Sequence, residues 1–391
     1  MSRVVILVID GLGIGAMPDA AALRQGDATA DTLGHVLDVD PPRLPTLAAL
    51  GLGLVHPHES LTEPLIPGAR AGRSALGYPG ADTFAGHQTM MGTDMNGVLP
   101  ALFRDHIDTV ASALRSAGHE ARPLDGLPVL LVDGRAVVGD NLEADPGLSW
   151  NVSGDLEEMT FDEILGIART VRRIAPTSRV IAVGGRGPEP ILRSVRHGTG
   201  GTAGLDTPAS GFYLNDGLQV VHLGVEIDHA AQLPSRAAEA GLPVTLIGKA
   251  ADIIVCPPAV RRPAVGTVEV LKETRTALTR ASDTLVVANV QETDLAGHQQ
   301  DAPRYRAHLR EVDLGLVPLL EAMEPGDHLI VTGDHGNDPT IGHPFHTREF
   351  VPLLHYDPAN SPAPSALPDS ATLANVARDA ARTLGIPFTE R

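Results

Sequence analysis

The sequence contains little cysteine, few aromatic residues and no long apolar run. Its single cysteine, Cys256, can form no intramolecular disulfide, which fits a reducing compartment. Aromatic side chains make up only 3% of the 391 residues, so the interior is expected to be mainly aliphatic. The first apolar run, Val4–Ile9, is too short for a signal segment or a membrane span. We therefore expect a cytoplasmic protein that does not bind membranes.

Basic residues are also scarce relative to acidic ones. The chain has 30 Lys and Arg against 48 Asp and Glu, which gives a formal charge of −18. No basic block is present, so binding to nucleic acid is not expected. The same surplus of negative charge would repel an anionic small substrate, so a phosphate site would need metal cations or a few placed basic side chains. The positions of the 16 histidines are therefore of interest, because histidine side chains can bind such metal cations.

Short apolar runs that end in Asp or Gly predict buried strands, and stretches with helical spacing lie between them. The expected strands are Val4–Ile9, Pro128–Val132, Val180–Val183, Val244–Ile247, Thr284–Ala288 and His328–Val331. The expected helices are Asp108–Ala117, Thr160–Ile174, Val268–Leu278, Tyr305–Met323 and Ala371–Leu384. This alternation predicts an α/β fold with a largely parallel sheet.

The length favours a core with a further domain or a large insertion. The segment Gly184–Gly204 is crowded with Gly, Arg and Thr and has no sustained periodicity, which predicts a loop. The chemically suggestive residues fall before about residue 90 and after about residue 290. We therefore predict a core formed by residues 1–97 and 219–391, with residues 98–218 as an inserted module.

Three expected strands end in residues that can bind metal ions. Asp10 follows the first strand, where open α/β sheets bind ligands, although a lone acid there is more often a turn or helix cap. Asp334 and His335 follow the last strand, and His346 lies on the Gly- and Pro-rich loop beyond it.

The remaining strand end carries Asp294 and His298, which are four residues apart. They share a face if the segment is helical, and Gly297 allows a turn if it is a loop. Carboxylates and imidazoles without thiolates suit Mn²⁺, Mg²⁺ or Zn²⁺. Six or seven such groups are enough for two ions.

A hydroxyl lies in the Gly-bounded segment Pro79–Gln88, at Thr83. On its own this residue is more often a helix N-cap. Beside a metal site, a coordinated Thr hydroxyl loses its proton more readily and can attack phosphorus. Thr83 is therefore a candidate nucleophile.

The chain resembles the phosphopentomutases, which belong to the alkaline phosphatase superfamily. The motifs that carry this resemblance are Asp10–Gly15, Asp31–His35, Asp82-Thr83 with Gly86-His87, Ile247–Lys249, Asp334–Thr340 and His346–Glu349. Asp294 and His298 are spaced as in the related cofactor-independent phosphoglycerate mutases, whereas phosphopentomutases usually space them by five. The resemblance implies an alkaline-phosphatase-like core whose largely parallel sheet is flanked by helices, with the inserted module as a smaller α/β cap domain.

The resemblance also implies roles for individual residues. One metal would be held by Asp10, Thr83, Asp334 and His335, and the other by Asp294, His298 and His346. The family metal is usually Mn²⁺. Thr83 stands four residues before His87, where the superfamily keeps its phosphorylated Ser or Thr. Lys249 and Ser149 match residues that bind substrate.

The inserted module departs from the family pattern. After Arg179–Ala182 the family usually has Arg-Pro-Phe and later Asn-Arg-His-Asp-Tyr, whose arginines bind the distal phosphate. Here the chain reads Val183–Arg186 and later His197–Gly201. Arg186, Arg193 or Arg196 can replace the missing arginines, since a guanidinium needs only the right direction of approach. After His87 the chain reads Gln88-Thr89 where the family usually has Trp-Glu, so a changed substrate stays open.

The expected reaction interconverts the 1- and 5-phosphates of ribose or 2-deoxyribose. Phospho-Thr83 would give its phosphoryl group to the sugar phosphate, forming a bound bisphosphate, with a sugar bisphosphate as activator and two divalent ions at the site. The alternatives are a mutase for another phosphosugar or phosphoacid, a phosphohydrolase of the same superfamily, and a non-catalytic protein that binds phosphosugars.

Overall fold

A computed structural model describes residues 2–124, 126–144, 146–212, 217–358 and 365–389. The chain forms two compact units, of which the first comprises residues 1–95 with 227–391 and the second residues 96–226. The boundaries expected from the sequence, 97/98 and 218/219, differ from these by two and eight residues. The larger difference arises because residues 219–224 form a strand of the second unit.

The first unit contains an eight-stranded sheet within the described residues, with strand order β12-β11-β13-β1-β14-β15-β2-β16. The strands are β1 (Arg3–Ile9), β2 (Ala69–Ser74), β11 (Val244–Gly248), β12 (Val260–Arg262), β13 (Thr284–Val290), β14 (His328–Thr332), β15 (Val351–Tyr356) and β16 (Ser365–Ala366). The run from β12 to β14 is parallel, and β15 is antiparallel to both of its neighbours. The prediction of a largely parallel sheet is confirmed.

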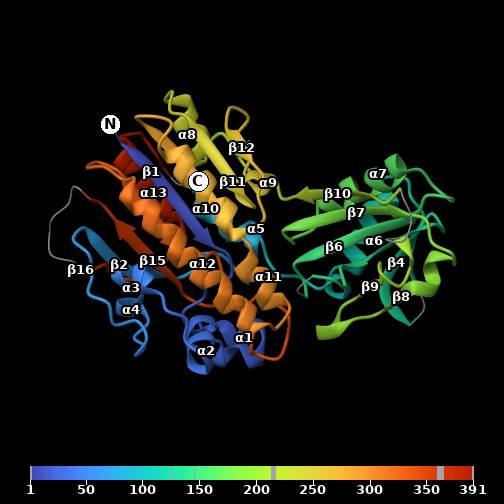
Figure 1. The fold of residues 1–391 in the computed structure, drawn as a ribbon. Helices are drawn as coiled ribbons and strands as arrows, with labels where there is room; N and C mark the ends of the chain where they lie inside the picture. The colour runs from blue at the N-terminus through green and yellow to red at the C-terminus, as the bar shows by residue number, and fades with distance from the viewer. Residues whose placement is uncertain (1, 125, 145, 213–216, 359–364, 390–391) are drawn as a thin grey trace. The chain divides into compact units, whose positions relative to one another are not determined.

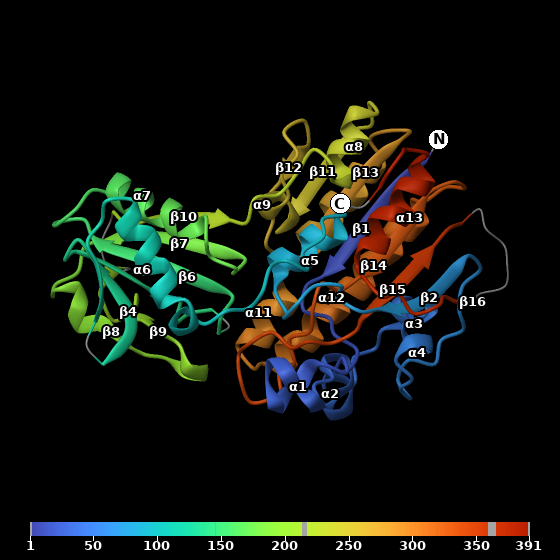
Figure 2. The ribbon, with the colours of Figure 1, turned by 180° about the vertical axis from the view of Figure 1, so that it is seen from behind.

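Helices cover both faces of this sheet. Helices α10 (Thr267–Leu278) and α12 (Ala302–Glu321) lie over the face turned toward the viewer in Figure 1. Helix α13 (Ala374–Leu384) lies over the opposite face, which Figure 2 shows from behind. The strand β1 is buried along its whole length between these layers, which explains its unbroken apolar run.

The other helices of the first unit are shorter. They are α1 (Ala20–Leu23), α2 (Thr32–Val39), α3 (Pro45–Ala49), α4 (Leu52–Val55), α5 (Thr83–Met90), α8 (Leu233–Glu239), α9 (Ala250–Ile253) and α11 (Glu292–His298), with a 3-10 helix at Gln25–Thr29. The described part of the chain has no helix of the length and apolarity needed to cross a membrane.

The second unit has a six-stranded sheet within its described residues, in the order β10-β7-β6-β5-β4-β3. Its strands are β3 (Ala121–Leu124), β4 (Leu127–Val132), β5 (Ala136–Asp140), β6 (Ser149–Asp155), β7 (Arg179–Gly185) and β10 (Gln219–Gly224). Among these described strands, β6 and β7 are the one pair that runs parallel. Helices α6 (Ile107–Ser116) and α7 (Phe161–Arg172) pack on one face around Trp150.

The segment Gly184–Gly204 is less irregular than predicted. It contains the end of β7, two 3-10 helices (Ile191–Ser194 and Thr199–Gly201) and a hairpin of β8 (Val195–His197) with β9 (Ala203–Leu205). Another 3-10 helix, Phe103–Asp105, precedes α6. The hairpin packs an apolar side on the sheet face opposite α6 and α7, which a periodicity search over such short strands does not detect.

Candidate active site

Four adjacent parallel strands bring the predicted site residues together. Strands β11, β13, β1 and β14 are neighbours in the sheet and end at the same edge. The residues that follow these strands are Lys249, Asp294 with His298, Asp10, and Asp334 with His335. Carboxyl ends of parallel strands form the ligand-binding edge of open α/β sheets, so chain segments distant in sequence meet here.

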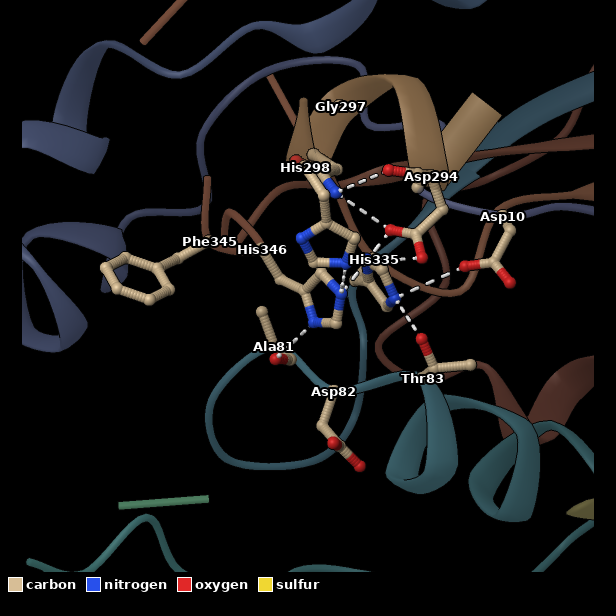
Figure 3. Close-up of polar contacts among 12 residues, drawn as sticks. Asp10, Ala81, Asp82, Thr83, Asp294, Gly297, His298, His335, Phe345 and His346 are labelled. Carbon is tan, nitrogen blue, oxygen red and sulfur yellow. Dashed lines mark hydrogen bonds and ion pairs between the residues drawn. The ribbon is translucent and has the colours of Figure 1, made fainter. Parts of the chain in front are cut away.

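One group of polar atoms surrounds Nε2 of His335. The Oγ1 atom of Thr83 lies 2.8 Å from it, Oδ2 of Asp334 lies 3.4 Å away and Oδ1 of Asp10 lies 3.5 Å away. Figure 3 shows the lines from His335 to Thr83 and Asp10. Both carboxylates and the imidazole are fully buried, whereas Thr83 is half-buried. The group thus combines three buried polar side chains with the partly exposed hydroxyl of Thr83.

Each carboxylate of this group has one bonded and one free oxygen. The Oδ2 atom of Asp10 accepts a hydrogen bond from Asn289 at 3.0 Å, and Oδ1 of Asp334 accepts one from the backbone N–H of Gly11 at 3.1 Å. The other two oxygens, Asp10 Oδ1 and Asp334 Oδ2, are buried and accept no hydrogen bond from any described residue. Buried carboxylate oxygens without donors are costly, and a divalent cation would stabilise them.

A second group consists of Asp294, His298 and His346. The Nε2 atoms of the two histidines lie 3.1 Å apart, and each lies 3.4 Å from an oxygen of Asp294. Their Nδ1 atoms face backbone carbonyls, His298 toward Pro344 at 2.6 Å and His346 toward Ala81 at 3.3 Å, so Nδ1 is the donor in each ring. Two Nε2 lone pairs then face one another beside a carboxylate, which is an arrangement suited to a metal ion.

Helix α11 explains the spacing in this group. Asp294 and His298 are four residues apart on one helix and therefore share a face, which confirms the helical alternative for this segment. Close packing beneath the helix requires glycine at position 297, because a Cβ there would lie 2.4 Å from the Asn337 side chain.

Negative charge accumulates at this edge of the sheet. Burial and the charge of Asp334 raise the pKa of Asp10 to about 7. Lys249 lies 2.7 Å from Asp10 and 3.2 Å from Asp294, and although burial opposes its charge, these carboxylates raise its pKa above the usual value. Burial lowers the pKa of His335 to about 4, so its imidazole is neutral, which is the form that binds metals.

Thr83 is the first residue of helix α5. Asp82 is the N-cap, since its Oδ1 accepts from the backbone N–H of Ala85 at 2.8 Å, and the alternative that Thr83 caps the helix is wrong. A helix N-terminus favours negative charge, so a phosphoryl group on Thr83 would lie at the favourable end. Arg348 fixes the preceding loop by donating to the carbonyls of Tyr78 and Gly80 at 2.7 and 2.6 Å.

Four buried polar residues support the site and were not predicted individually: His87, Asn289, Asn337 and Glu349. Glu349 accepts from both Thr32 and Thr347 hydroxyls at 2.6 Å and from the backbone N–H of Gly15 at 3.0 Å. It therefore braces the turn after Asp10. The sequence signal for Asn289, Asn337 and Glu349 is a polar residue in or near an apolar strand, whereas His87 on helix α5 has no such signal.

The predicted substrate-binding residues, apart from Lys249, lie in the second unit. Ser149 is buried on β6, where its hydroxyl accepts from Asn141 at 3.3 Å. The three arginines each have an acidic partner: Arg186 with Glu157 at 2.6 Å, Arg193 with Glu189 at 2.6 Å, and Arg196 with Asp206 at 2.5 Å. Their role in binding substrate stays a prediction.

Gln88, which departs from the family pattern, has its side chain in the protein interior. The Gln88 side chain is buried, donates to the carbonyl of Ile253 at 2.9 Å and accepts from Gln232 at 2.7 Å. These bonds are the same kind of packing contact that other buried polar groups make. This exchange therefore does not by itself indicate a changed substrate.

A third cluster with metal-binding side chains comprises Glu292, His308 and Glu311. Glu292 accepts from both the backbone N–H and the hydroxyl of Thr267, at 2.7 and 2.9 Å, and so caps α10. Arg304 donates to His308 at 3.3 Å. The cluster is thus explained as a link between helices.

Comparison with known proteins gives consistent matches along the chain. A family model described as the metalloenzyme superfamily matches residues 2–387. A phosphopentomutase from Anaeromyxobacter dehalogenans is 31% identical, covering 91% of this chain and 89% of its own. One from Methylobacterium nodulans is 30% identical, covering 99% and 98%. A solved phosphoglycerate mutase from Leishmania mexicana covers 99% of this chain and 96% of its own, with 15% identity and a TM-score of 0.48.

Proposed function

Because the chain belongs to the metalloenzyme superfamily and, within it, to the phosphopentomutase family, we propose that it moves a phosphate between positions 1 and 5 of ribose or 2-deoxyribose. Membership supports an enzyme that uses divalent metal ions and acts as a phosphosugar mutase. The observation that carries the proposal is the placement of the Thr83 hydroxyl beside His335, Asp10 and Asp334, next to a second group of metal-binding side chains.

The donor atoms fit two divalent cations. Asp10, Thr83, Asp334 and His335 would hold one, and Asp294, His298 and His346 the other; the unbonded oxygens of Asp10 and Asp334 support the first set and the facing Nε2 atoms the second. Oxygen and imidazole donors without thiolate suit Mn²⁺, which we propose as the metal. When bound, the cations would neutralise phosphate charge and favour the deprotonated Thr83 hydroxyl.

In the proposed cycle Thr83 is phosphorylated at the start. The free hydroxyl of the sugar phosphate attacks this phosphorus, the bond from phosphorus to Thr83 Oγ1 breaks, and a sugar bisphosphate forms. After the bisphosphate has turned over, Thr83 Oγ1 attacks the phosphorus of its other phosphate, the bond from that phosphorus to the sugar oxygen breaks, and the isomerised sugar phosphate leaves with Thr83 phosphorylated again. A sugar bisphosphate would also load Thr83 initially and so act as the activator.

The residues around Thr83 would assist the same transfer in both directions. The positive end of α5 and the Lys249 ammonium would stabilise the transferring phosphoryl group. Arg348 would hold Thr83 in place through the carbonyls before it. We further propose that the second unit excludes water and contributes Ser149 and at least one of Arg186, Arg193 and Arg196 to the distal phosphate.

The proposal is tested with purified protein, Mn²⁺, α-ribose 1-phosphate and a trace of ribose 1,5-bisphosphate, followed by ³¹P NMR. We expect ribose 5-phosphate to accumulate without release of inorganic phosphate. Release of inorganic phosphate would instead identify a phosphohydrolase. If both pentose phosphates are inert and another phosphosugar is isomerised, the pentose assignment is wrong and the mutase assignment remains.

The Thr89→Val variant provides a matched control for this assay. Thr89 lies on the same helix as Thr83, and its buried hydroxyl makes no hydrogen bond with any described residue. Replacing it with an isosteric apolar side chain should therefore leave the helix intact. We expect this variant to convert the substrate at close to the parent rate, whereas Thr83→Val should be inactive.

A further inference from the structure

His87 lies directly beneath the candidate nucleophile and is fully buried. It is four residues after Thr83 on α5, and its Nδ1 atom lies 2.9 Å from the Thr83 carbonyl oxygen and 3.3 Å from Oδ2 of Asp334. Its other ring nitrogen, Nε2, lies 3.0 Å from the amide nitrogen of Asn289. One imidazole thus touches the nucleophile's backbone, a candidate metal ligand and a strand-end amide.

The partners of these atoms fix the direction of each hydrogen bond. The amide nitrogen of Asn289 has two hydrogens and also lies 3.0 Å from Oδ2 of Asp10, so one hydrogen goes to this carboxylate. The second goes to His87 Nε2, which is then the acceptor. With Nε2 as the acceptor, the ring carries its proton on Nδ1, which faces the Thr83 carbonyl and Asp334.

These contacts link both carboxylates of the first group. Asn289 donates to Oδ2 of Asp10 and to His87, and Nδ1 of His87 lies 3.3 Å from Oδ2 of Asp334. Asp10 Oδ1 is left without a hydrogen bond among the described residues. That free oxygen is the one that faces His335.

The second group has an amide of its own. The side-chain nitrogen of Asn337 donates to Oδ1 of Asp294 at 2.8 Å and to its backbone carbonyl at 3.1 Å. Asn289 and Asn337 thus make the same kind of contact to different carboxylates, since Asn289 bonds Asp10 and Asn337 bonds Asp294. The chain therefore offers a matched pair of buried amides for comparison.

From this geometry we infer that His87 and Asn289 are positioning residues that orient Asp10 and Asp334 toward the cation beside Thr83. The inference rests on the proposed function, because it assumes that the first group binds a metal ion. Partners that orient metal ligands typically contribute about 10–100-fold to metal affinity. Asn337 would act on the second group in the same manner.

Titration calorimetry of the metal-free protein with Mn²⁺ tests this inference. His335→Ala and His346→Ala identify which binding step belongs to which group. We expect Asn289→Leu to weaken the first-group step by about 10–100-fold with the second-group step close to the parent, and Asn337→Leu to do the reverse. Weakening of both steps to the same extent by Asn289→Leu would indicate a general packing defect and overturn the inference.

Two substitutions at His87 provide the decisive comparison if Asn289→Leu does not fold. Asn at position 87 can place an amide N–H where Nδ1 stands, whereas Gln extends its amide toward the position of Nε2. We expect His87→Asn to keep first-group affinity within about 3-fold of the parent and His87→Gln to lose about 10-fold or more. Equal affinities in the two variants would overturn the role given to the Nδ1 proton.

The outcome is separable from that of the proposed function. In one outcome, the parent binds two Mn²⁺ ions and each Asn variant weakens only its own binding step, while the parent does not isomerise α-ribose 1-phosphate. In that case the inference holds and only the pentose assignment fails. If the parent binds no Mn²⁺, the inference itself is overturned.

Discussion

The two units hold their charged side chains in different ways. In the first unit Asp10, Asp294 and Asp334 are buried and each receives a hydrogen bond from a backbone or side-chain N–H. In the second unit the side chains of Arg186, Arg193 and Arg196 are 48%, 71% and 58% exposed, and each faces an acid. Exposed ion pairs of this kind contribute about 0–1 kcal/mol, so they exchange partners easily.

The difference suits the roles proposed for the two units, catalysis in the first and substrate binding in the second. Groups that must stabilise a transition state are most effective when they are fixed before the substrate arrives, which the buried edge of the parallel sheet provides. Exposed arginines on short segments can reorient toward a phosphate at little cost. We therefore expect substitutions in the first unit to lower kcat and those in the second unit to raise KM.

The largest effect is expected at Thr83. Thr83→Ala removes the hydroxyl beside His335, and we expect kcat for phosphate transfer to fall by roughly 10³-fold or more, since no covalent intermediate can form. Metal content should stay close to the parent because three of the four ligands of that group remain. Retention of more than a tenth of the parent kcat would contradict the assignment.

Asp294 should matter more for metal binding than His298. Asp294 is a member of the second group, but one of its oxygens also lies within 4.8 Å of ligand atoms of Asp10 and His335 in the first group, whereas His298 contacts only the second group. Elemental analysis of Asp294→Ala should therefore show loss of both ions, and His298→Ala should lose one. Equal metal content in the two variants would show that Asp294 is not shared.

Chelation of the parent should abolish activity, and Mn²⁺ should restore it.

Smaller effects are expected from the arginines of the second unit. Arg186→Ala, Arg193→Ala and Arg196→Ala are compared for pentose phosphate conversion, and at least one should raise KM by roughly 10-fold, since a charge-assisted hydrogen bond contributes about 1.5–3 kcal/mol. Metal content should be unchanged in all three. If none of the three raises KM, the distal end of the substrate is bound by other groups.

The smallest effect concerns stability at the other end of β14. His328 and His355 are buried, with their ring nitrogens 2.9 Å apart, and burial lowers the pKa of His328 to about 4 and that of His355 well below its usual value. The unfolded chain takes up these protons near pH 6.5, whereas the folded chain takes them up only near pH 4 or below. Above about pH 7 the two histidines therefore do not change the free energy of unfolding through proton uptake. As the pH falls toward 4, they lower it and so destabilise the folded chain.

His355→Gln tests this pH dependence. Each such histidine can change the free energy of unfolding by up to about 1.4 kcal/mol per pH unit. Urea unfolding at pH 8, 6 and 5 should show that the variant loses roughly 2 kcal/mol less stability than the parent between pH 8 and 5. Parallel curves for both proteins would show that this pair does not titrate on unfolding.

Much of the first unit could be predicted from the sequence because its strands are buried on both faces. The run Val4–Ile9 predicted β1, which extends over Arg3–Ile9, and the polar residues after each such run lie at the shared edge. The antiparallel strands were harder. Strand β6 (Ser149–Asp155) is buried throughout, but its only large apolar residues are Trp150 and Val152, so it lacks the continuous apolar run that marks the buried strands of the first unit.

The supporting contacts of the site could not be predicted from local patterns. Asp82 and Thr83 are both good N-cap residues, and only the backbone conformation shows that Asp82 has this role. His87 on helix α5 contacts Asn289 near the end of β13. The two residues are far apart in the sequence, so no local sequence pattern predicts this contact. Sequence motifs predicted the residues proposed to act on the substrate, while the groups that orient them depend on packing.

The most direct test of the account is intact-mass analysis of the protein after incubation with Mn²⁺ and ribose 1,5-bisphosphate, followed by peptide mapping. The account predicts one added phosphoryl group, located on Thr83, in the parent and in Thr89→Val, and none in Thr83→Ala. Equal phosphorylation of the parent and Thr83→Ala, or a phosphoryl group mapped to any other residue, would contradict it.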